Sequence, residues 1–121
     1  MTEEPVEESL GRVTIAPNVL VTIVQKTAVS APGVARLHET VPNVKRLLGF
    51  HTVGRGVEVR VVDDQVSVDV YLVALRGVDL LQMGRQLQHE ITRAMQDIVG
   101  IPVREVNVHI EDVAIEVAAE S

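Results

Sequence analysis

The chain contains no cysteine and no tryptophan, and its aromatic residues are limited to Phe50 and Tyr71. Without cysteine it has neither a disulfide framework nor a thiolate for zinc or redox chemistry. With so few aromatic rings, the core must be built from aliphatic side chains, and 25 valines supply much of it. Because β-branched side chains favour strands, this composition predicts a sheet-rich domain.

The chain also lacks a signal peptide pattern, a membrane span and an excess of positive charge. Its first ten residues carry four glutamates, and no stretch approaches the roughly 20 apolar residues of a transmembrane helix. The formal net charge is −6, which disfavours contact with nucleic-acid phosphates. We therefore expect a cytoplasmic protein that binds no nucleic acid, does not span the membrane, and reaches its inner face only through a partner.

A length of 121 residues suits one domain with one core. We expect a disordered acidic tail at 1–10, a single domain at 11–113 and a C-terminal tail at 114–121. Residues 12–15 read as a short strand, and Pro17 suits the first position of a helix at 17–31 that Pro32 and Gly33 end. The apolar stripe of this helix is wide, which fits either a deeply seated helix or one that also packs against another subunit.

A strand at 34–38 is followed by a long connection at 39–55, which concentrates the positive charge of Lys45, Arg46 and Arg55. Such a connection is either a solvated basic loop or a site for an anion or an acidic partner. Strands at 57–61 and 66–73 then alternate on either side of a turn at Asp63-Asp64 and form a hairpin with one core face and one solvated face.

The next helix, 80–99, is capped by Asp79 and ended by Gly100. Its predicted buried positions are Leu80, Gly84, Leu87, Ile91, Met95 and Ile98. Gly84 is expected to let the helix approach the sheet, so a larger residue there should be costly. With a last strand at 103–113, the predicted fold is α+β: a two-layer sandwich of a mixed sheet with two helices on one face, in the order β-α-β-β-β-α-β.

No motif for a nucleophile elbow, a phosphate loop or a dinucleotide site is present, and the four histidines are not spaced as metal ligands. We therefore predict no catalytic, cofactor or metal site and no enzyme. His109 shares the polar face of the sheet with Asp69, Tyr71 and Asn107. This group is either a set of cross-strand polar pairs or a cluster of the kind found in active sites.

Four segments together resemble the alkaline shock protein family, also called the Asp/Gls family, an envelope stress response domain. They are Gly11–Pro17 with its following helix, Ala31–Val34, the strand Val68–Val73, and Gly100 with Val106–Val113. The resemblance covers nearly all of the chain from Gly11 to Val113. In the connection, Leu47-Leu48-Gly49 is kept within a shorter and more basic surround.

The resemblance implies a non-enzymatic protein of the envelope stress response and of cell-envelope homeostasis that acts through protein contacts and self-association. Its implied partners are a separate membrane-anchoring protein or, alternatively, acetyl-CoA carboxylase subunits, which would make it a regulatory module of fatty-acid synthesis. The expected interaction surface is drawn from Lys45, Arg46, Arg55, Asp69, Tyr71, Asn107 and His109.

Overall fold

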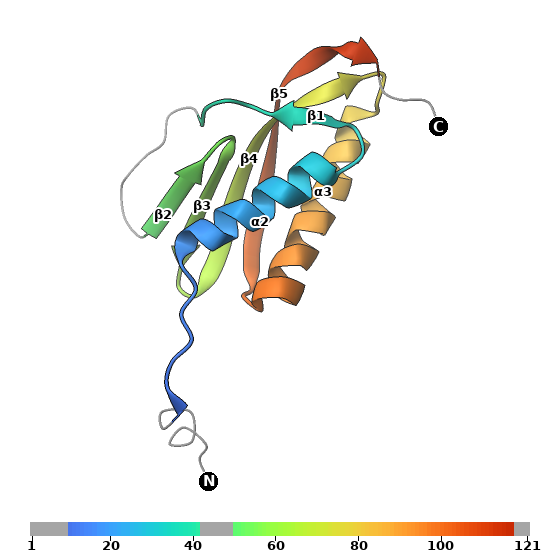
Figure 1. Cartoon of the computed structure of the whole chain (residues 1–121). Coiled ribbons are helices and arrows are strands. Elements are labelled where there is room, and N and C mark those ends of the chain that lie inside the picture. Colours follow the sequence, from blue (N-terminus) through green and yellow to red (C-terminus); the bar gives the residue numbers. More distant parts are fainter. Residues whose placement is uncertain (1–9, 42–49, 118–121) are drawn as a thin grey trace.

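The computed structural model of the chain describes residues 10–41 and 50–117. Two helical segments lie side by side over one face of a five-stranded sheet (Figure 1). The elements, in chain order, are α2 (Pro17–Ser30), β1 (Val34–Leu37), β2 (Phe50–Gly54), β3 (Val57–Val62), β4 (Gln65–Arg76), α3 (Leu80–Ala94), the π-helical turn η1 (Met95–Val99) and β5 (Val103–Val117). The predicted fold class, an α+β two-layer sandwich with a mixed sheet, is confirmed.

Strand β4 organises the sheet, because three other strands pair with it. β1 and β3 both run antiparallel to β4, β3 along Gln65–Val70 and β1 along Leu72–Ala74, while β5 pairs parallel to it. β2 extends the sheet beyond β3. Within the described residues, β2 and β5 are therefore the two edge strands of the sheet.

The local signals for the two helices and the hairpin are confirmed. Pro17 opens α2, and the Asp79 side chain accepts a hydrogen bond from the backbone N–H of Gln82 at the start of α3. Asp63 and Asp64 both have positive φ, as a two-residue hairpin turn of type I′ requires. Gly100 ends the second helical segment with a left-handed φ of 81°.

The predicted first strand, 12–15, is wrong. Residues 11–16 are extended but pair with no other strand of the described sheet. Alternation of Val13 and Ile15 with polar residues favours an extended backbone, but a strand also needs a neighbour for its hydrogen bonds. The observed order therefore begins with a helix rather than a strand.

The predicted connection 39–55 contains a strand that the sequence analysis missed. β2 pairs antiparallel with β3 from Phe50 opposite Val61 to Gly54 opposite Val57. Its glycine-containing turn to β3 resembled an irregular loop, whereas Gly54 is needed for packing. A Cβ on Gly54 would lie 2.6 Å from the Val21 side chain of α2.

The buried face of the second helical segment differs in part from the prediction. Leu87, Ile91 and Met95 are buried as expected, but Met83 replaces the half-exposed Leu80. Ile98 is exposed, and Val99 packs against the core instead. The reason is η1, because a π-helical turn places one more residue in the turn and rotates the following side chains.

The core lies between the two layers and is almost wholly aliphatic. Its largest fully buried side chains include Leu72, Leu87, Ile91 and Met95. β5 continues to Val117, past the expected domain end at 113, and Ala114 is buried. Among the described helices, none has the length and apolar character needed to cross a membrane.

Candidate functional site

The face of the sheet that the helices leave uncovered carries a group of four contacting polar side chains. We call Arg60 of β3, Asp69 and Tyr71 of β4, and His109 of β5 the open-face cluster. Register brings them together, because Asp69 lies opposite Asn107 and Tyr71 lies opposite His109. Alternation along each strand points all four away from the aliphatic core.

Asp69 is the centre of this cluster. Its Oδ2 accepts a hydrogen bond from Arg60 Nη2 at 2.9 Å, and its Oδ1 lies 2.9 Å from His109 Nε2. Since a carboxylate only accepts, the histidine ring donates through Nε2. His109 also stacks on Tyr71, with ring centroids 4.3 Å apart and planes 9° from parallel. Each side chain is therefore fixed by at least one other.

The open face is drier than the hairpin pattern predicted. Glu58, Ser67 and Asp69 are all buried, with Asp69 only 8% exposed, so the expectation of a solvated face fails at its centre. Glu58 lies directly opposite Asp69, and like charges in that position repel. Arg60 offsets this repulsion, since it pairs with Asp69 and approaches Glu105 of β5 at 3.7 Å.

The electrostatics of the cluster act on Tyr71. Burial raises the pKa of the Tyr71 hydroxyl above its usual value of 10.0, and the negative charges of Asp69, Glu58 and Glu111 raise this pKa further. Arg60 partly opposes them by lowering the same pKa. Tyr71 therefore remains a neutral hydrogen-bonding group throughout the physiological range.

This arrangement orders side chains more than it assembles reactive groups. Asp69 holds His109 as in an acid–base pair, but neither hollow described below includes a member of the cluster. No group of three or more histidine and acidic side chains that could hold a metal ion is found within 10–41 and 50–117. Half-buried Tyr, His and Arg side chains held in fixed positions are typical of the centre of a protein–protein interface.

The structure unites some of the predicted interaction residues and separates others. Asp69, Tyr71 and His109 meet, and Asn107 lies beside them on β5. Arg55 lies elsewhere, in the turn between β2 and β3, where it faces Glu39 at 3.8 Å. Lys45 and Arg46 lie outside the described residues.

Glu58 is the site residue that the sequence analysis overlooked, and Arg60 was noted without being assigned to the site. The signal was present in the hairpin turn. A two-residue turn at Asp63-Asp64 fixes the pairing of Val62 with Gln65, and counting outward places Glu58 opposite Asp69.

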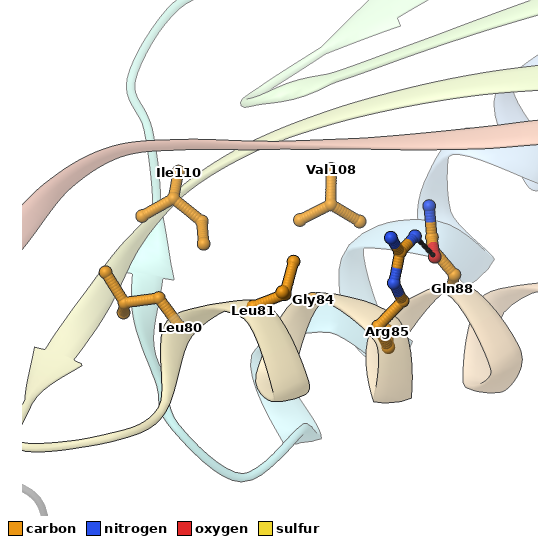
Figure 2. Close-up of a pocket in the computed structure, with 7 residues that line it drawn as sticks. All are labelled: Leu80, Leu81, Gly84, Arg85, Gln88, Val108 and Ile110. Atoms are coloured by element: carbon orange, nitrogen blue, oxygen red, sulfur yellow. Dashed lines mark hydrogen bonds between the residues drawn. The ribbon is translucent and has the colours of Figure 1, made fainter.

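Two hollows lie on the helix layer. The larger, of about 350 Å³, runs between α3 and β5 and is shown in Figure 2. It is lined by Leu80, Leu81, Gly84, Arg85, Gln88, Val108 and Ile110. The second, of about 270 Å³, lies where α2 ends and α3 begins, beside Gly33, Val78 and Met83. The predicted close approach at Gly84 is wrong, because a Cβ there would meet only Val108, at 4.0 Å.

Comparison with known proteins identifies relatives along most of the chain. It is 30% identical over 112 residues to the uncharacterized protein YqhY of Bacillus subtilis (strain 168), an alignment that covers 92% of this chain and 83% of that protein. It is 29% identical over 112 residues to the uncharacterized protein Spy1535 of Streptococcus pyogenes serotype M6, covering 90% and 84%. No solved structure matches the chain significantly. Residues 5–115 match the model of the alkaline shock protein 23 family, described by a cell envelope-related function.

Proposed function

This chain belongs to the alkaline shock protein 23 family, whose function is related to the cell envelope, and from this premise we propose that it works through protein contacts. In this proposal the open-face cluster binds a protein partner at the envelope, and copies of the chain associate with one another. The chain performs no chemical step itself.

The observation that carries the proposal is the fixed, half-buried arrangement of the open-face cluster. Its side chains already occupy defined positions through the 2.9 Å contacts of Asp69 with Arg60 and His109. A partner that binds them loses little side-chain entropy on binding, which favours affinity. The stacked Tyr71 and His109 rings offer a flat apolar surface beside charged groups.

Self-association is supported by apolar side chains that the fold leaves in solvent. Val19 and Val29 of α2 are exposed, as are Leu81 of α3 and Ile115 of β5. Exposed apolar residues on several elements, together with two edge strands, favour contacts between copies.

Site-specific photo-cross-linking in cells of the native host tests the partner contact. A photoreactive residue replaces Asn107 beside the cluster or, as the control, the exposed Gln86 on α3. We expect the Asn107 position to give one discrete adduct with a membrane-fraction protein, and Tyr71→Ala to abolish it. The Gln86 position should give no such adduct.

Two results would contradict this assignment. An Asn107 adduct that persists unchanged in Tyr71→Ala would remove the cluster from the interface. Adducts with acetyl-CoA carboxylase subunits in the soluble fraction would instead support the regulatory alternative that the family resemblance implies.

A further inference from the structure

The segment before α2 is an apolar arm without a partner in its own chain. Val13 is 91% exposed and Ile15 is 48% exposed, although both are large hydrophobic residues that proteins usually bury. Figure 1 shows the segment, in dark blue, leaving the start of α2 and extending away from the sheet and the helices. Its backbone is extended, and Arg12 and Thr14 alternate with Val13 and Ile15. The arm thus has the backbone and the pattern of a strand, but no neighbouring strand.

The edge of β5 is a strand without a neighbour on one side. Within the described part of the chain this 15-residue strand pairs only with β4. Its unpaired backbone groups are therefore open to another strand, as at any exposed sheet edge. The Gln88 side chain donates a hydrogen bond to the Val106 carbonyl at 3.0 Å, which leaves the stretch from Val108 onward for an incoming strand.

The groove in Figure 2 lies beside this stretch of β5. Val108 and Ile110 point from the strand towards α3, where the missing side chain of Gly84 leaves space between helix and strand. Leu80 and the exposed Leu81 extend the apolar lining. A strand added at the edge of β5 would therefore place every second side chain into an apolar groove.

The arm and the edge match on both faces. Val13 and Ile15 would continue the row of Val108 and Ile110 on the helix side of the sheet. Arg12 would lie on the open face, where β5 carries Glu105 and Glu111. The match therefore includes alternation, apolar contact and charge.

We propose that the arm Arg12–Ile15 of one copy adds as a strand to the free edge of β5 in a second copy, with Val13 and Ile15 in the groove beside Gly84. The arm cannot serve its own groove directly, because it starts at the end of α2 that lies over β2 and β3, whereas the groove lies along α3 and β5 (Figure 1). The other edge strand, β2, has five residues and offers a shorter template. This proposal rests on the self-association in the proposed function and names its surfaces.

Two variants of the full chain separate the two halves of the contact. The arm variant carries Val13→Asp and Ile15→Asp, both at exposed positions. The groove variant carries Gly84→Leu, which fills the groove with a good helix former, and Gly84→Ala is its matched control. In sedimentation velocity over a concentration series, we expect the wild type and Gly84→Ala to associate. Each of the other two variants should associate at least about tenfold more weakly.

Mixing the two defective variants is the decisive step. The arm variant retains an intact groove, and the groove variant retains an intact arm, so an equimolar mixture should form a one-to-one complex that neither variant forms alone. Because the chain lacks cysteine, Ile15→Cys on one copy can also be tested for disulfide formation with Val108→Cys on another. Val53→Cys on β2 serves as the control position.

The outcomes separate this proposal from the one on which it rests. If the wild type associates and both variants associate equally well, or if Ile15→Cys couples to Val53→Cys instead, docking of the arm on β5 is overturned while self-association stands. A wild type that remains monomeric at every concentration overturns both. Complementation in the mixture together with the Ile15–Val108 disulfide supports both.

Discussion

Asp69 is the residue on which the order of the open face depends, because it alone contacts both Arg60 and His109. Removing its charge while keeping its shape, with Asp69→Asn, weakens both contacts. A carboxylate in charge-assisted hydrogen bonds contributes about 1.5–3 kcal/mol when its partners are well placed. Since Arg60 and His109 are partly exposed and solvent screens them, we expect the free energy of unfolding to fall by about 1–2 kcal/mol.

Urea unfolding measures this change as a lower midpoint at an unchanged slope. Asp64→Asn is the matched control, because Asp64 lies exposed in the hairpin turn with positive φ, a conformation that asparagine also adopts readily. A midpoint for Asp69→Asn equal to that of Asp64→Asn would show that the cluster does not stabilise the sheet.

Tyr71 gives the open face a measurable pH dependence. Its pKa is raised in the folded state, first by burial and then by Asp69, Glu58 and Glu111, so the folded chain holds the phenolic proton more tightly than the unfolded chain. The associated stability is therefore fully present below the unfolded pKa of about 10 and is lost as the pH rises through the folded pKa. The chain has one tyrosine and no tryptophan, so tyrosinate absorbance should follow this group without interference.

The prediction is a tyrosinate transition above pH 10 in the folded protein that moves to lower pH in Asp69→Asn. Part of the shift should remain in the variant, since burial is the larger cause. A transition at the same pH in the folded and the urea-unfolded wild type would contradict the proposed environment of the ring.

The membership of the cluster was only partly predictable from single residues. His109, Asp69 and Tyr71 were recognised because alternation places them on one face, and Glu58 follows from the hairpin register. Burial of Glu58 and Ser67 on a face with no second layer could not be derived, because exposure depends on the three-dimensional packing of long side chains over their neighbours. Alternation specifies the face of the sheet and does not specify its solvation.

Among the secondary-structure elements, glycine explains several differences between prediction and structure. Gly84 lies in α3 with a negative φ, and a Cβ there meets nothing closer than Val108 at 4.0 Å. We therefore expect Gly84→Ala to stabilise the protein by about 0.5–1 kcal/mol through helix propensity and the loss of unfolded-state freedom. This reverses the expectation drawn from the sequence. Thermal unfolding of the variant at low protein concentration measures it, and a lower midpoint would restore the close-approach interpretation.

Gly56 behaves in the opposite way. It lies where β1 and β3 meet along the same edge of β4, with a φ of 65°, and an added Cβ would lie 2.8 Å from the carbonyl oxygens of His38 and Tyr71. Neither backbone group can move without breaking the pairing with β4. We expect Gly56→Ala to cost more than about 2 kcal/mol, as overpacking and positive φ both oppose it.

A chemical denaturation series that includes Gly84→Ala as the matched helix substitution tests this difference in sign. Equal midpoints for the two alanine variants would contradict the tight junction. The sequence marked Gly54 and Gly56 as loop residues because glycine is common in loops. Their actual reason, close approach of α2 to β2 and of β1 to β3, involves contacts between distant segments that periodicity does not encode.

For the whole molecule, the fold class was predictable and the strand set was not. Two amphipathic helices with aliphatic alternating strands leave few arrangements other than helices on one face of a sheet. The same alternation at 12–15 indicated a strand correctly as a backbone conformation but incorrectly as a member of this sheet. A strand is defined by its partner, and a single sequence does not reveal whether the partner belongs to the same chain.

Arm exchange between copies makes stability depend on concentration. If the arm binds β5 of a second copy, association favours the folded state by mass action, and each tenfold rise in concentration adds up to about 0.7 kcal/mol per protomer of a dimer. For a domain of this size, the unfolding temperature should then rise by roughly 2–4 °C per tenfold increase in concentration. The arm variant with Val13→Asp and Ile15→Asp should unfold at one temperature throughout, because its isolated fold keeps every buried contact of the core. A wild type with a constant midpoint would show that the arm remains in solvent, and the exposed Val13 would then need another partner, for which the envelope protein captured through the open face is the first candidate.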